Sequence, residues 1–265
     1  MLSIALCQLT SSDIPAENLE AIRHGVARAA AGGARVVVFP EAAMARFGGP
    51  LKPLAEPLEG PWAKGVAAIA DEHEVLVVAG MFTPAEDGRV RNTLLVTGLG
   101  RHLGYHKIHL YDAFGFRESD TVAPGDEPVT LAVDGITLGL ATCYDIRFPE
   151  LFRALADRGA AAVVVPTSWG AGEGKREQWE VLVRARALDS GCWVLGCGQA
   201  DPVATGVEVN PKAPTGIGYS IVADGFGRVH AQLGPGPDLV VVEVDPAVTE
   251  RARTATGALA NRRLG

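Results

Sequence analysis

The sequence predicts one α/β domain in which two mixed β-sheets pack face to face, with helices on the outside. Apolar, strand-like runs alternate with amphipathic segments along most of the 265 residues. A unit of helix, Gly, Ala, three valines and Pro occurs twice, as AAAGGARVVVFP and ALADRGAAAVVVP, and it indicates two similar halves. Because no linker rich in Pro, Ser and Gly divides the chain, we expect residues 1–265 to form a single domain. A single doubly wound sheet is the alternative.

The first half alternates short apolar strands with amphipathic helices. Residues 16–33 place Leu19, Ile22 and Val26 at helical spacing and end in two glycines, so they predict a helix. Residues 62–74 predict a second helix. The segment ARVVVFPE carries the apolar run VVVFP, which is typical of a strand buried on both faces. The expected strands are 3–10, 34–41 and 75–82, followed by a hairpin over 90–107.

The second half repeats this alternation and then continues with antiparallel pairs. Residues 149–160 predict a helix that Gly159 ends, and residues 176–191 predict another helix. The polar tail over 247–263 is expected to be helical or extended on the surface. The expected strands and hairpins are a hairpin over 129–143, strands over 161–169 and 192–200, and closing hairpins from 218–233 and 238–245.

The composition is that of a globular protein in water. Hydrophobic residues make up 48% of the chain, charged residues 21%, and the net charge is −7, which argues against a nucleic-acid-binding surface. The opening MLSIALCQLTSSD is apolar but short and has no basic region, so we interpret it as a strand and not as a signal peptide. No apolar run approaches the roughly 20 residues that a membrane helix needs. We therefore expect a cytoplasmic protein that binds neither membranes nor nucleic acids.

The cysteines do not predict a metal site or disulfides. Cys7, Cys143, Cys192 and Cys197 form no C-x-x-C pair, and no histidine cluster stands beside them. Without a secretion signal, reduced thiols are expected. We interpret all of them except Cys143 as structural residues.

Cys143 stands where an apolar strand gives way to a helix. TLGLATC ends the strand, and a helical pattern begins near Pro149. In α/β sheets, ligands bind at the carboxyl ends of strands, and the N–H groups of the incoming helix would stabilise a thiolate or an oxyanion there. A buried structural cysteine is the alternative, because free cysteine is among the most buried residue types. Asp145 and Arg147, which follow directly, indicate an ion pair or a cleft.

A nucleophilic cysteine needs a base and a group that stabilises the oxyanion. His102, His106 and His109 cluster in RHLGYHKIHLYD, so a Cys–His pair is one possibility. Glu41 is another, because it ends the buried strand VVVFPE, where a charge is costly unless it is paired or used. A solvated strand end is the alternative for Glu41. Lys107 also follows an apolar stretch, and its alternative is a surface lysine.

Three segments, in this order, resemble the nitrilase or carbon–nitrogen hydrolase superfamily: VVFPE with Glu41, HKIHLYD with Lys107 and LATCYDIRFPE with Cys143. The resemblance extends to PTSW at 166–169 and to RARALDSGCWVLGCGQAD, so it covers nearly the whole chain. It implies a four-layer αββα sandwich and a catalytic triad of Glu41, Lys107 and Cys143. Glu118, in a segment similar to the family's ES…PG pattern, is the implied second catalytic glutamate. The resemblance also implies a homodimer or a larger homo-oligomer.

These residue types are those of a cysteine amidase that needs no metal or organic cofactor. Glu41 would take the thiol proton, and Cys143 would attack the carbonyl of a small amide. Lys107 and the backbone N–H of Tyr144 would stabilise the oxyanion. A thioester would form as ammonia leaves, and water would then release the acid. Glu118 would position the substrate and Lys107.

The segment CYDIRFPEL is most similar to the Nit or ω-amidase branch of the superfamily. Nitrilases typically carry Trp after the nucleophile, where this chain has Tyr144, so amide hydrolysis is favoured over nitrile hydrolysis. An N-carbamoyl amino acid hydrolase or a nitrilase is the alternative within the superfamily. A DJ-1-like redox protein is the alternative of a different class.

Several residues near Cys143 are candidates for binding the oxyanion or the substrate. These candidates are Tyr144, Arg147 and Trp169. Arg147 would bind a substrate carboxylate or would pair structurally with Glu150 or Asp145, and we favour the structural role. Lys175 and Arg176, in SWGAGEGKREQW, would recognise an acidic substrate or would lie on the solvated surface.

Overall fold

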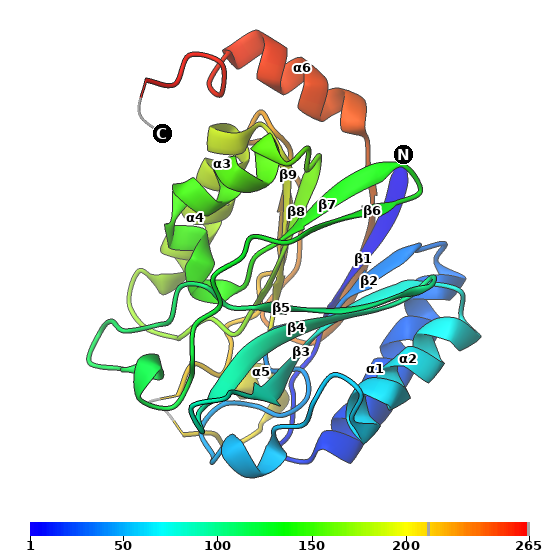
Figure 1. Cartoon of the computed structure of the whole chain (residues 1–265), viewed down its shortest axis with the longest axis vertical. Helices are drawn as coiled ribbons and strands as arrows, with labels where there is room; N and C mark the ends of the chain where they lie inside the picture. The colour runs from blue at the N-terminus through cyan, green and yellow to red at the C-terminus, as the bar shows by residue number, and fades with distance from the viewer. Residues whose placement is uncertain (211–212, 264–265) are drawn as a thin grey trace.

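The computed structural model describes residues 1–210 and 213–263, which build two mixed six-stranded sheets facing each other (Figure 1). In each sheet, three neighbouring strands run parallel and antiparallel strands flank them. The order across the first sheet is β12 (Asp238–Val244), β1 (Leu2–Gln8), β2 (Val36–Val38), β3 (Leu76–Pro84), β4 (Val90–Gly98) and β5 (Arg101–His106). The order across the second sheet is β11 (Val229–Gln232), β10 (Ile221–Ala223), β9 (Trp193–Gly198), β8 (Ala162–Thr167), β7 (Ile136–Leu140) and β6 (Thr130–Val133).

Helices cover the outer face of each sheet. In Figure 1, α1 and α2 lie against the first sheet, while α3 and α4 lie against the second. The layers therefore follow the order α, β, β, α, which confirms the expected sandwich, and the single doubly wound sheet is wrong. The helices are α1 (Pro15–Ala31), α2 (Pro61–Glu72), α3 (Pro149–Asp157), α4 (Lys175–Ser190), α5 (Pro202–Thr205) and α6 (Pro246–Thr256), and the 3₁₀ turns are η1 (Lys52–Leu54), η2 (Glu118–Asp120) and η3 (Cys143–Arg147).

The two halves of the chain share one plan. The first half runs β1, α1, β2, α2 and β3 before the antiparallel strands β4 and β5, and the second runs β7, α3, β8, α4 and β9 before β10 and β11. The repeated helix–Gly–Ala–valine unit leads from α1 into β2 and from α3 into β8. The expectation of two similar halves, which rested on this unit, is confirmed.

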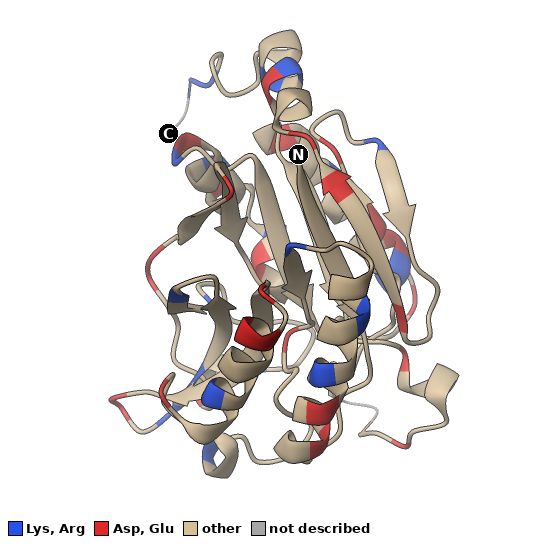
Figure 2. Cartoon of the chain, turned by 90° about the vertical axis from the view of Figure 1, so that its right-hand side faces the viewer, with Lys and Arg blue, Asp and Glu red and all other residues tan. Residues whose placement is uncertain are grey.

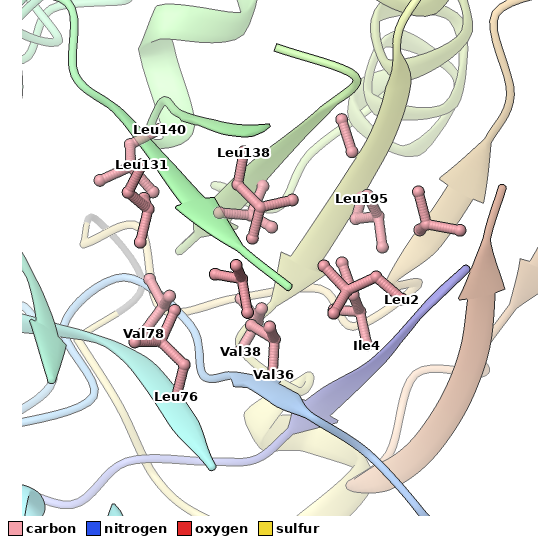
Figure 3. Packing of buried hydrophobic residues seen from close by; sticks show 14 of the residues in the cluster. Leu2, Ile4, Val36, Val38, Leu76, Val78, Leu131, Leu138, Leu140 and Leu195 are labelled. Carbon is pink, nitrogen blue, oxygen red and sulfur yellow. The ribbon is translucent and has the colours of Figure 1, made fainter. Parts of the chain in front are cut away.

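The valine runs of β2 and β8 are apolar throughout because both of their faces are covered. Val36 and Val38 face the opposite sheet, whereas Val37 packs against the helix layer of α1 and α2. Val164 in β8 likewise faces the first sheet, and its neighbour Val165 faces α3 and α4. Figure 3 shows the layer between the sheets, where aliphatic side chains from both sheets interdigitate. The side chains labelled there are Leu2, Ile4, Val36, Val38, Leu76, Val78, Leu131, Leu138, Leu140 and Leu195.

The strand β12 differs from the expectation. It pairs antiparallel with β1, with Leu2 opposite Val244, and so it joins the first sheet while β11 stays in the second. This pairing gives partners to the backbone N–H and C=O groups on the outer edge of β1. It also places Val242 toward the second sheet and Val241 toward α1.

The polar tail contains a helix, which decides between the two expected conformations. Asp245 caps α6 by accepting a hydrogen bond from the N–H of Ala247 at 2.9 Å. The helix ends at Gly257, whose φ of 60° suits the left-handed C-cap position. Among the described residues, no helix has both the length and the apolar character that crossing a bilayer requires.

The outer surface of α1 and α2 carries charges of both signs. Figure 2 shows acidic and basic residues interspersed along the helices on this side of the molecule. Arg23 of α1 contacts Glu72 of α2, with Nη1 3.3 Å from Oε2. An exposed ion pair of this kind contributes about 0–1 kcal/mol. The two helices are therefore held mainly by their buried apolar sides.

Candidate active site

Glu41, Lys107 and Cys143 line one pocket. Glu41 lies just beyond β2, Lys107 directly follows β5, and Cys143 opens the turn η3 after β7. The chain leaves the sheets at these points, so the side chains project from strand ends and not from the packed interior. The space inside this pocket, its open mouth included, is about 560 Å³.

The Glu41 carboxylate is surrounded by hydrogen-bond donors. Its Oε1 accepts from Nδ2 of Asn92 at 2.7 Å and from Nζ of Lys107 at 3.1 Å. Its Oε2 accepts from the backbone N–H of Ser168 at 2.8 Å. The same carboxylate lines the pocket together with Cys143, and its charge raises the pKa of that thiol. Glu41 is buried, so the solvated strand end that was its alternative is wrong.

Lys107 is buried between two carboxylates. Its Nζ lies 3.1 Å from Oε1 of Glu41 and 2.9 Å from Oε2 of Glu118. Burial alone would lower the pKa of this ammonium, but the negative charges of Glu118 and Glu41 outweigh burial, so the pKa of Lys107 is raised well above its ordinary value. Lys107 is therefore a fixed cation in the pocket, and the surface-lysine alternative is wrong.

The thiol of Cys143 rests in its protonated form. Burial raises its pKa well above the ordinary value, the charge of Glu41 raises it further, and Lys107 acts in the opposite direction. Its Sγ also lies 3.8 Å from the carbonyl oxygen of Ser168. A buried thiol becomes nucleophilic only when a neighbouring base removes its proton. The candidate base that shares the pocket with Cys143 is the carboxylate of Glu41.

The backbone at Cys143 is strained. Its φ is 48°, in the left-handed region that residues with a side chain rarely adopt. This conformation turns the chain sharply between β7 and η3 and presents the thiol at the strand end. The sequence had led us to expect the N–H groups of the next helix, α3. The N–H groups that follow Cys143 belong instead to η3. The reason is that α3 begins six residues later, at Pro149, which has no N–H to offer.

The loop that carries Glu118 is fastened on both sides. Oε2 of Glu118 accepts from the N–H of Tyr111 at 2.6 Å. On the other side, the guanidinium of Arg89 donates to the carbonyls of Ser119 at 2.9 Å and Val122 at 3.1 Å. The loop therefore holds the Glu118 carboxylate against Lys107, where the resemblance placed a second glutamate.

Two residues that the sequence reasoning missed complete the polar centre of the pocket. Asn92 is fully buried in β4, and its Nδ2 donates to Glu41 at 2.7 Å and to Glu118 at 3.2 Å. Ser168 supplies the N–H that binds Oε2 of Glu41. The signal for Asn92 was a carboxamide directly before the apolar part of the strand VRNTLLVTG.

The histidines are not partners of the thiol. His102 bonds to Thr97 at 3.0 Å, and His106 bonds to Thr93 at 2.9 Å. His109 bonds to the carboxylate of Asp145 at 2.7 Å. Within the part of the chain that the structure describes, none of these rings lines the pocket of Cys143, so the Cys–His alternative is wrong.

Arg147 faces the pocket and does not form either of the ion pairs considered for it. Its Nη2 donates to Oε1 of Gln178 at 2.7 Å, whereas Asp145 is occupied elsewhere. In residues 1–210 and 213–263, no carboxylate lies within 4.0 Å of its guanidinium, and its buried Nε has no hydrogen-bond partner. The preference for a structural pairing with Glu150 or Asp145 is therefore wrong.

Aromatic rings hold the Arg147 guanidinium at the pocket wall. Its Cζ lies 5.2 Å from the ring centre of Trp169 and 5.9 Å from that of Tyr144, and both rings line the pocket. The Trp169 indole donates from Nε1 to the carbonyl of Lys175 at 2.9 Å. Tyr144 packs edge-on against Tyr111, with 5.1 Å between ring centres. The candidates Tyr144, Arg147 and Trp169 thus lie together.

The two cations of the Gly-rich loop have different places. Lys175 lines the pocket, and its Nζ lies 3.6 Å from the ring centre of Phe114. Burial, followed by the nearby charge of Arg147, lowers the pKa of Lys175. Arg176 points away from the pocket, where it pairs with Glu180 at 2.7 Å and stacks on Tyr219. The acidic-ligand hypothesis is therefore kept for Lys175, and the surface alternative holds for Arg176.

The remaining cysteines lie away from the pocket. Cys7, Cys192 and Cys197 are buried free thiols. Within residues 1–210 and 213–263, no group of three His, Cys, Asp or Glu side chains has the arrangement of a metal site.

Fold and site together define the class of protein, an αββα sandwich hydrolase of the nitrilase type. The family model for carbon–nitrogen hydrolases matches residues 3–254, which is nearly the whole chain, and the chain belongs to that family. The resemblance predicted from the Glu41, Lys107 and Cys143 segments is thus confirmed, and the DJ-1-like alternative is wrong. The protein is an enzyme of the carbon–nitrogen hydrolase kind.

Relatives at the sequence level include a hydrolase of Mycobacterium tuberculosis, which is 52% identical over 265 residues. The alignment covers 98% of this chain and 95% of the relative's sequence. A deaminated glutathione amidase of Escherichia coli O157:H7 is 32% identical over 98% of this chain and 97% of its own. An omega-amidase of Homo sapiens is 31% identical over 91% of this chain and 88% of its own. The expected similarity to the Nit and ω-amidase branch is confirmed.

Solved structures agree with this placement. A Saccharomyces cerevisiae member of branch 10 of the nitrilase superfamily superposes with a TM-score of 0.85, at 26% identity over 99% of this chain and 97% of its own. An amidase of Nesterenkonia sp. AN1 superposes with a TM-score of 0.82, at 28% identity over 99% of this chain and 94% of its own. That structure is a glutamate-to-glutamine variant with the acetamide moiety of fluoroacetamide added covalently at the active site cysteine.

Proposed function

We propose that the chain is a cysteine amidase that hydrolyses a small amide bearing a carboxylate, through a thioester on Cys143. The observation that carries this proposal is the meeting of the Glu41 carboxylate, the Cys143 thiol and the fixed cation of Lys107 in one pocket, where Glu41 also raises the pKa of the thiol. A carboxylate base, a thiol and a buried ammonium are the groups that acyl transfer from an amide requires.

The first half of the reaction forms the thioester. Glu41 removes the thiol proton as Sγ of Cys143 attacks the amide carbonyl carbon, and the carbonyl oxygen becomes an oxyanion. Nζ of Lys107 and the N–H of Tyr144 stabilise that oxyanion, and a well-aimed donor contributes roughly 3–4 kcal/mol. The protonated Glu41 then donates its proton to the amide nitrogen as the C–N bond breaks, and ammonia leaves.

The second half of the reaction releases the acid. Glu41, again a carboxylate, takes a proton from a water molecule whose oxygen attacks the thioester carbon. The new tetrahedral intermediate is stabilised by the same donors. When it collapses, the C–S bond breaks, the thiolate recovers its proton from Glu41, and the carboxylic acid departs. Glu118 takes no proton in this sequence, and it positions Lys107 and the substrate.

The substrate class follows from the charges at the pocket wall. Arg147 and Lys175 both line the pocket, and neither has a carboxylate partner among the described residues. Two cations beside each other repel unless an anion lies between them. Glu41 and Glu118 are occupied by Lys107 and cannot fill that place. We therefore assign a carboxylate on the acyl part of the substrate to this wall, as in the half-amide of a dicarboxylic acid.

Names of relatives support this substrate class. One relative is an omega-amidase and another is a deaminated glutathione amidase. An N-carbamoyl amino acid also carries a carboxylate, so it is the competing substrate within the family. A nitrile is disfavoured because Tyr144, and not Trp, follows the nucleophile.

A release assay tests the proposal. Purified protein is incubated with half-amides of dicarboxylic acids, N-carbamoyl amino acids, uncharged aliphatic amides and nitriles, and ammonia is measured. We expect turnover of the half-amides and none with the Cys143→Ala variant, which keeps its fold by circular dichroism. Activity confined to carbamoyl substrates or nitriles would overturn the substrate class, and an active Cys143→Ala would overturn the proposed function.

We also propose that the chain forms a homodimer or a larger homo-oligomer. In support of this, α4 exposes Val181 and Leu188 on the outside of the molecule, and these two residues lie about two helical turns apart. Light scattering during size-exclusion chromatography measures the mass. A monomer at micromolar concentration would contradict the proposal.

A further inference from the structure

The carboxylate of Asp145 is fully buried and accepts four hydrogen bonds. Its Oδ1 accepts from the backbone N–H of His109 at 2.9 Å and from Nδ1 of the same residue at 2.7 Å. Its Oδ2 accepts from the Tyr105 hydroxyl at 2.6 Å and from the N–H of Thr142 at 2.9 Å. Tyr105, His109, Thr142 and Asp145 are called the Asp145 cluster below.

The Asp145 cluster encloses both reacting segments. Tyr105 and His109 stand two residues before and two residues after Lys107. Thr142 and Asp145 stand one residue before and two residues after Cys143. A single carboxylate therefore links the segments on both sides of Lys107, through the Tyr105 hydroxyl and the His109 backbone, to the segments on both sides of Cys143.

We propose that His109 and Asp145 are positioning residues. They keep Nζ of Lys107 aligned with the carbonyl oxygen of the substrate that Cys143 attacks. The inference rests on the proposed function. None of the four residues of the Asp145 cluster lines the pocket, so they act through Lys107 and Cys143 and do not touch the substrate.

The strain at Cys143 explains why such a fastening is required. A non-glycine residue at φ 48° costs energy and persists only where its surroundings hold it. Asp145 holds the turn from inside, because Thr142 donates its N–H to the Asp145 side chain while the N–H of Asp145 donates to the carbonyl of Thr142 at 3.0 Å. The Thr142 hydroxyl adds a bond to the carbonyl of Pro166 at 2.8 Å.

His109 is the member of the Asp145 cluster that can be changed without opening the core. Because a carboxylate only accepts, Nδ1 of His109 must carry the proton in this contact. Its ring stacks on Phe148 with 3.8 Å between centres, and 26% of the side chain is exposed. An asparagine places an amide N–H close to the position of Nδ1, whereas a leucine fills similar space without any donor.

The test compares His109→Leu and His109→Asn with a matched control. His230 forms the same kind of pair, with Nε2 2.7 Å from Oδ2 of Asp224 and 33% of its side chain exposed, but it lies outside the pocket. Steady-state kinetics are measured on the half-amide and normalised to the fraction of folded protein, which circular dichroism measures. This normalisation removes any loss that comes only from unfolded protein.

We expect His109→Leu to lower kcat by about tenfold or more with KM changed by less than about threefold, because alignment of the oxyanion donor is lost while binding is kept. We expect His109→Asn to recover most of kcat and His230→Leu to leave it unchanged. A kcat for His109→Leu within about twofold of the wild type overturns the inference. So does an equal loss in His109→Asn, or a loss confined to KM.

If His109→Leu does not fold, Tyr105→Phe decides the question, since it removes only the donor to the other oxygen of Asp145. A normalised kcat that falls with KM unchanged supports the inference, and an unchanged kcat overturns it. The proposed function fails separately, through an active Cys143→Ala. An active His109→Leu together with an inactive Cys143→Ala overturns only the positioning role.

Discussion

Lys107 and Glu118 form a buried ion pair, with Nζ 2.9 Å from Oε2, and Glu41 approaches the same ammonium from β2 at 3.1 Å. Two carboxylates thus share one cation, and Asn92 donates to both of them. In this arrangement Glu41 acts electrostatically on the Cys143 thiol, while Glu118 keeps the ammonium in place. Glu41 and Glu118 are the same residue type, so their different roles follow from their different surroundings.

Lys107→Met tests the oxyanion role. Removing the cation leaves two buried carboxylates facing each other, which we expect to cost roughly 3–5 kcal/mol of unfolding free energy. Loss of the oxyanion donor should lower kcat by about 10²–10³. Thermal denaturation and steady-state kinetics measure the two effects.

The double variant Lys107→Met/Glu118→Gln separates stability from catalysis. Replacing Glu118 by an amide removes the repulsion, so most of the lost stability should return, while kcat should stay low. If kcat returned together with stability, Lys107 would be a structural cation and the oxyanion role would be wrong.

Glu41→Gln tests the base. An amide cannot take the proton of Cys143, whose pKa is raised by burial and by the charge of Glu41 itself, so the thioester should not form. We expect kcat to fall by about 10²–10⁴. Intact-mass spectrometry of quenched reactions should show no substrate-derived acyl adduct.

The matched control for this variant is Glu56→Gln. Glu56 is a half-buried glutamate outside the pocket that accepts a hydrogen bond from the N–H of Ala63 at 3.0 Å. The Glu56→Gln variant should keep wild-type turnover. An acyl adduct that still accumulates on Glu41→Gln would mean that another group removes the thiol proton.

The three strand-end residues could be predicted from the sequence because each follows its own apolar run. A charged or reactive side chain at such a position is costly unless it is used, so Glu41, Lys107 and Cys143 were each candidates, although each taken alone kept a structural or solvated alternative. The sandwich and its two similar halves were visible in the alternation and in the repeated valine unit, and the order of the segments resembled one family.

The partners of these residues could not be predicted in the same way. Asn92 meets Glu41 only because β4 folds back beside β3, and nothing local in VRNTLLVTG specifies that neighbour. Ser168 reaches Glu41 from the other sheet, across 127 positions of sequence. The orientation of Arg147 was mistaken for a similar reason, since its true contact, Gln178, lies on α4.

Arg147→Ala and Lys175→Ala test the anion-binding wall, with Arg176→Ala as the matched control. A hydrogen bond to a charged group contributes about 1.5–3 kcal/mol, so loss of Arg147 should lower kcat/KM for a half-amide roughly 10- to 100-fold, mainly through KM. Lys175→Ala should act in the same direction. Arg176→Ala should have no effect, because this neighbour pairs with Glu180 outside the pocket.

The substrate series gives the second comparison for this wall. With an uncharged amide of equal length, the Arg147→Ala and wild-type enzymes should differ little, because no carboxylate is present to bind. Equal losses of kcat/KM on the charged and uncharged amides would show that Arg147 shapes the pocket and does not read the substrate's charge.

Cys7 makes the stability of the fold sensitive to alkaline pH. This thiol lies in β1 under α1, with Sγ 3.8 Å from the carbonyl of Gly25, and burial raises its pKa to about 12 while the charge of Arg28 lowers it to a smaller extent. The folded state therefore holds the proton more tightly than the unfolded chain does. The resulting stabilisation is fully present below the thiol pKa of the unfolded chain, about 8.5, and is lost as pH rises toward the folded-state pKa. Each pH unit in that window lowers the unfolding free energy by about 1.4 kcal/mol.

Urea unfolding of Cys7→Ala and of the wild type tests this effect. Between about pH 8.5 and pH 10, the unfolding free energy of Cys7→Ala should fall less than that of the wild type, by about 1–2 kcal/mol, and the two curves should be parallel below about pH 8. Parallel curves over the whole range would mean that Cys7 titrates alike in both states.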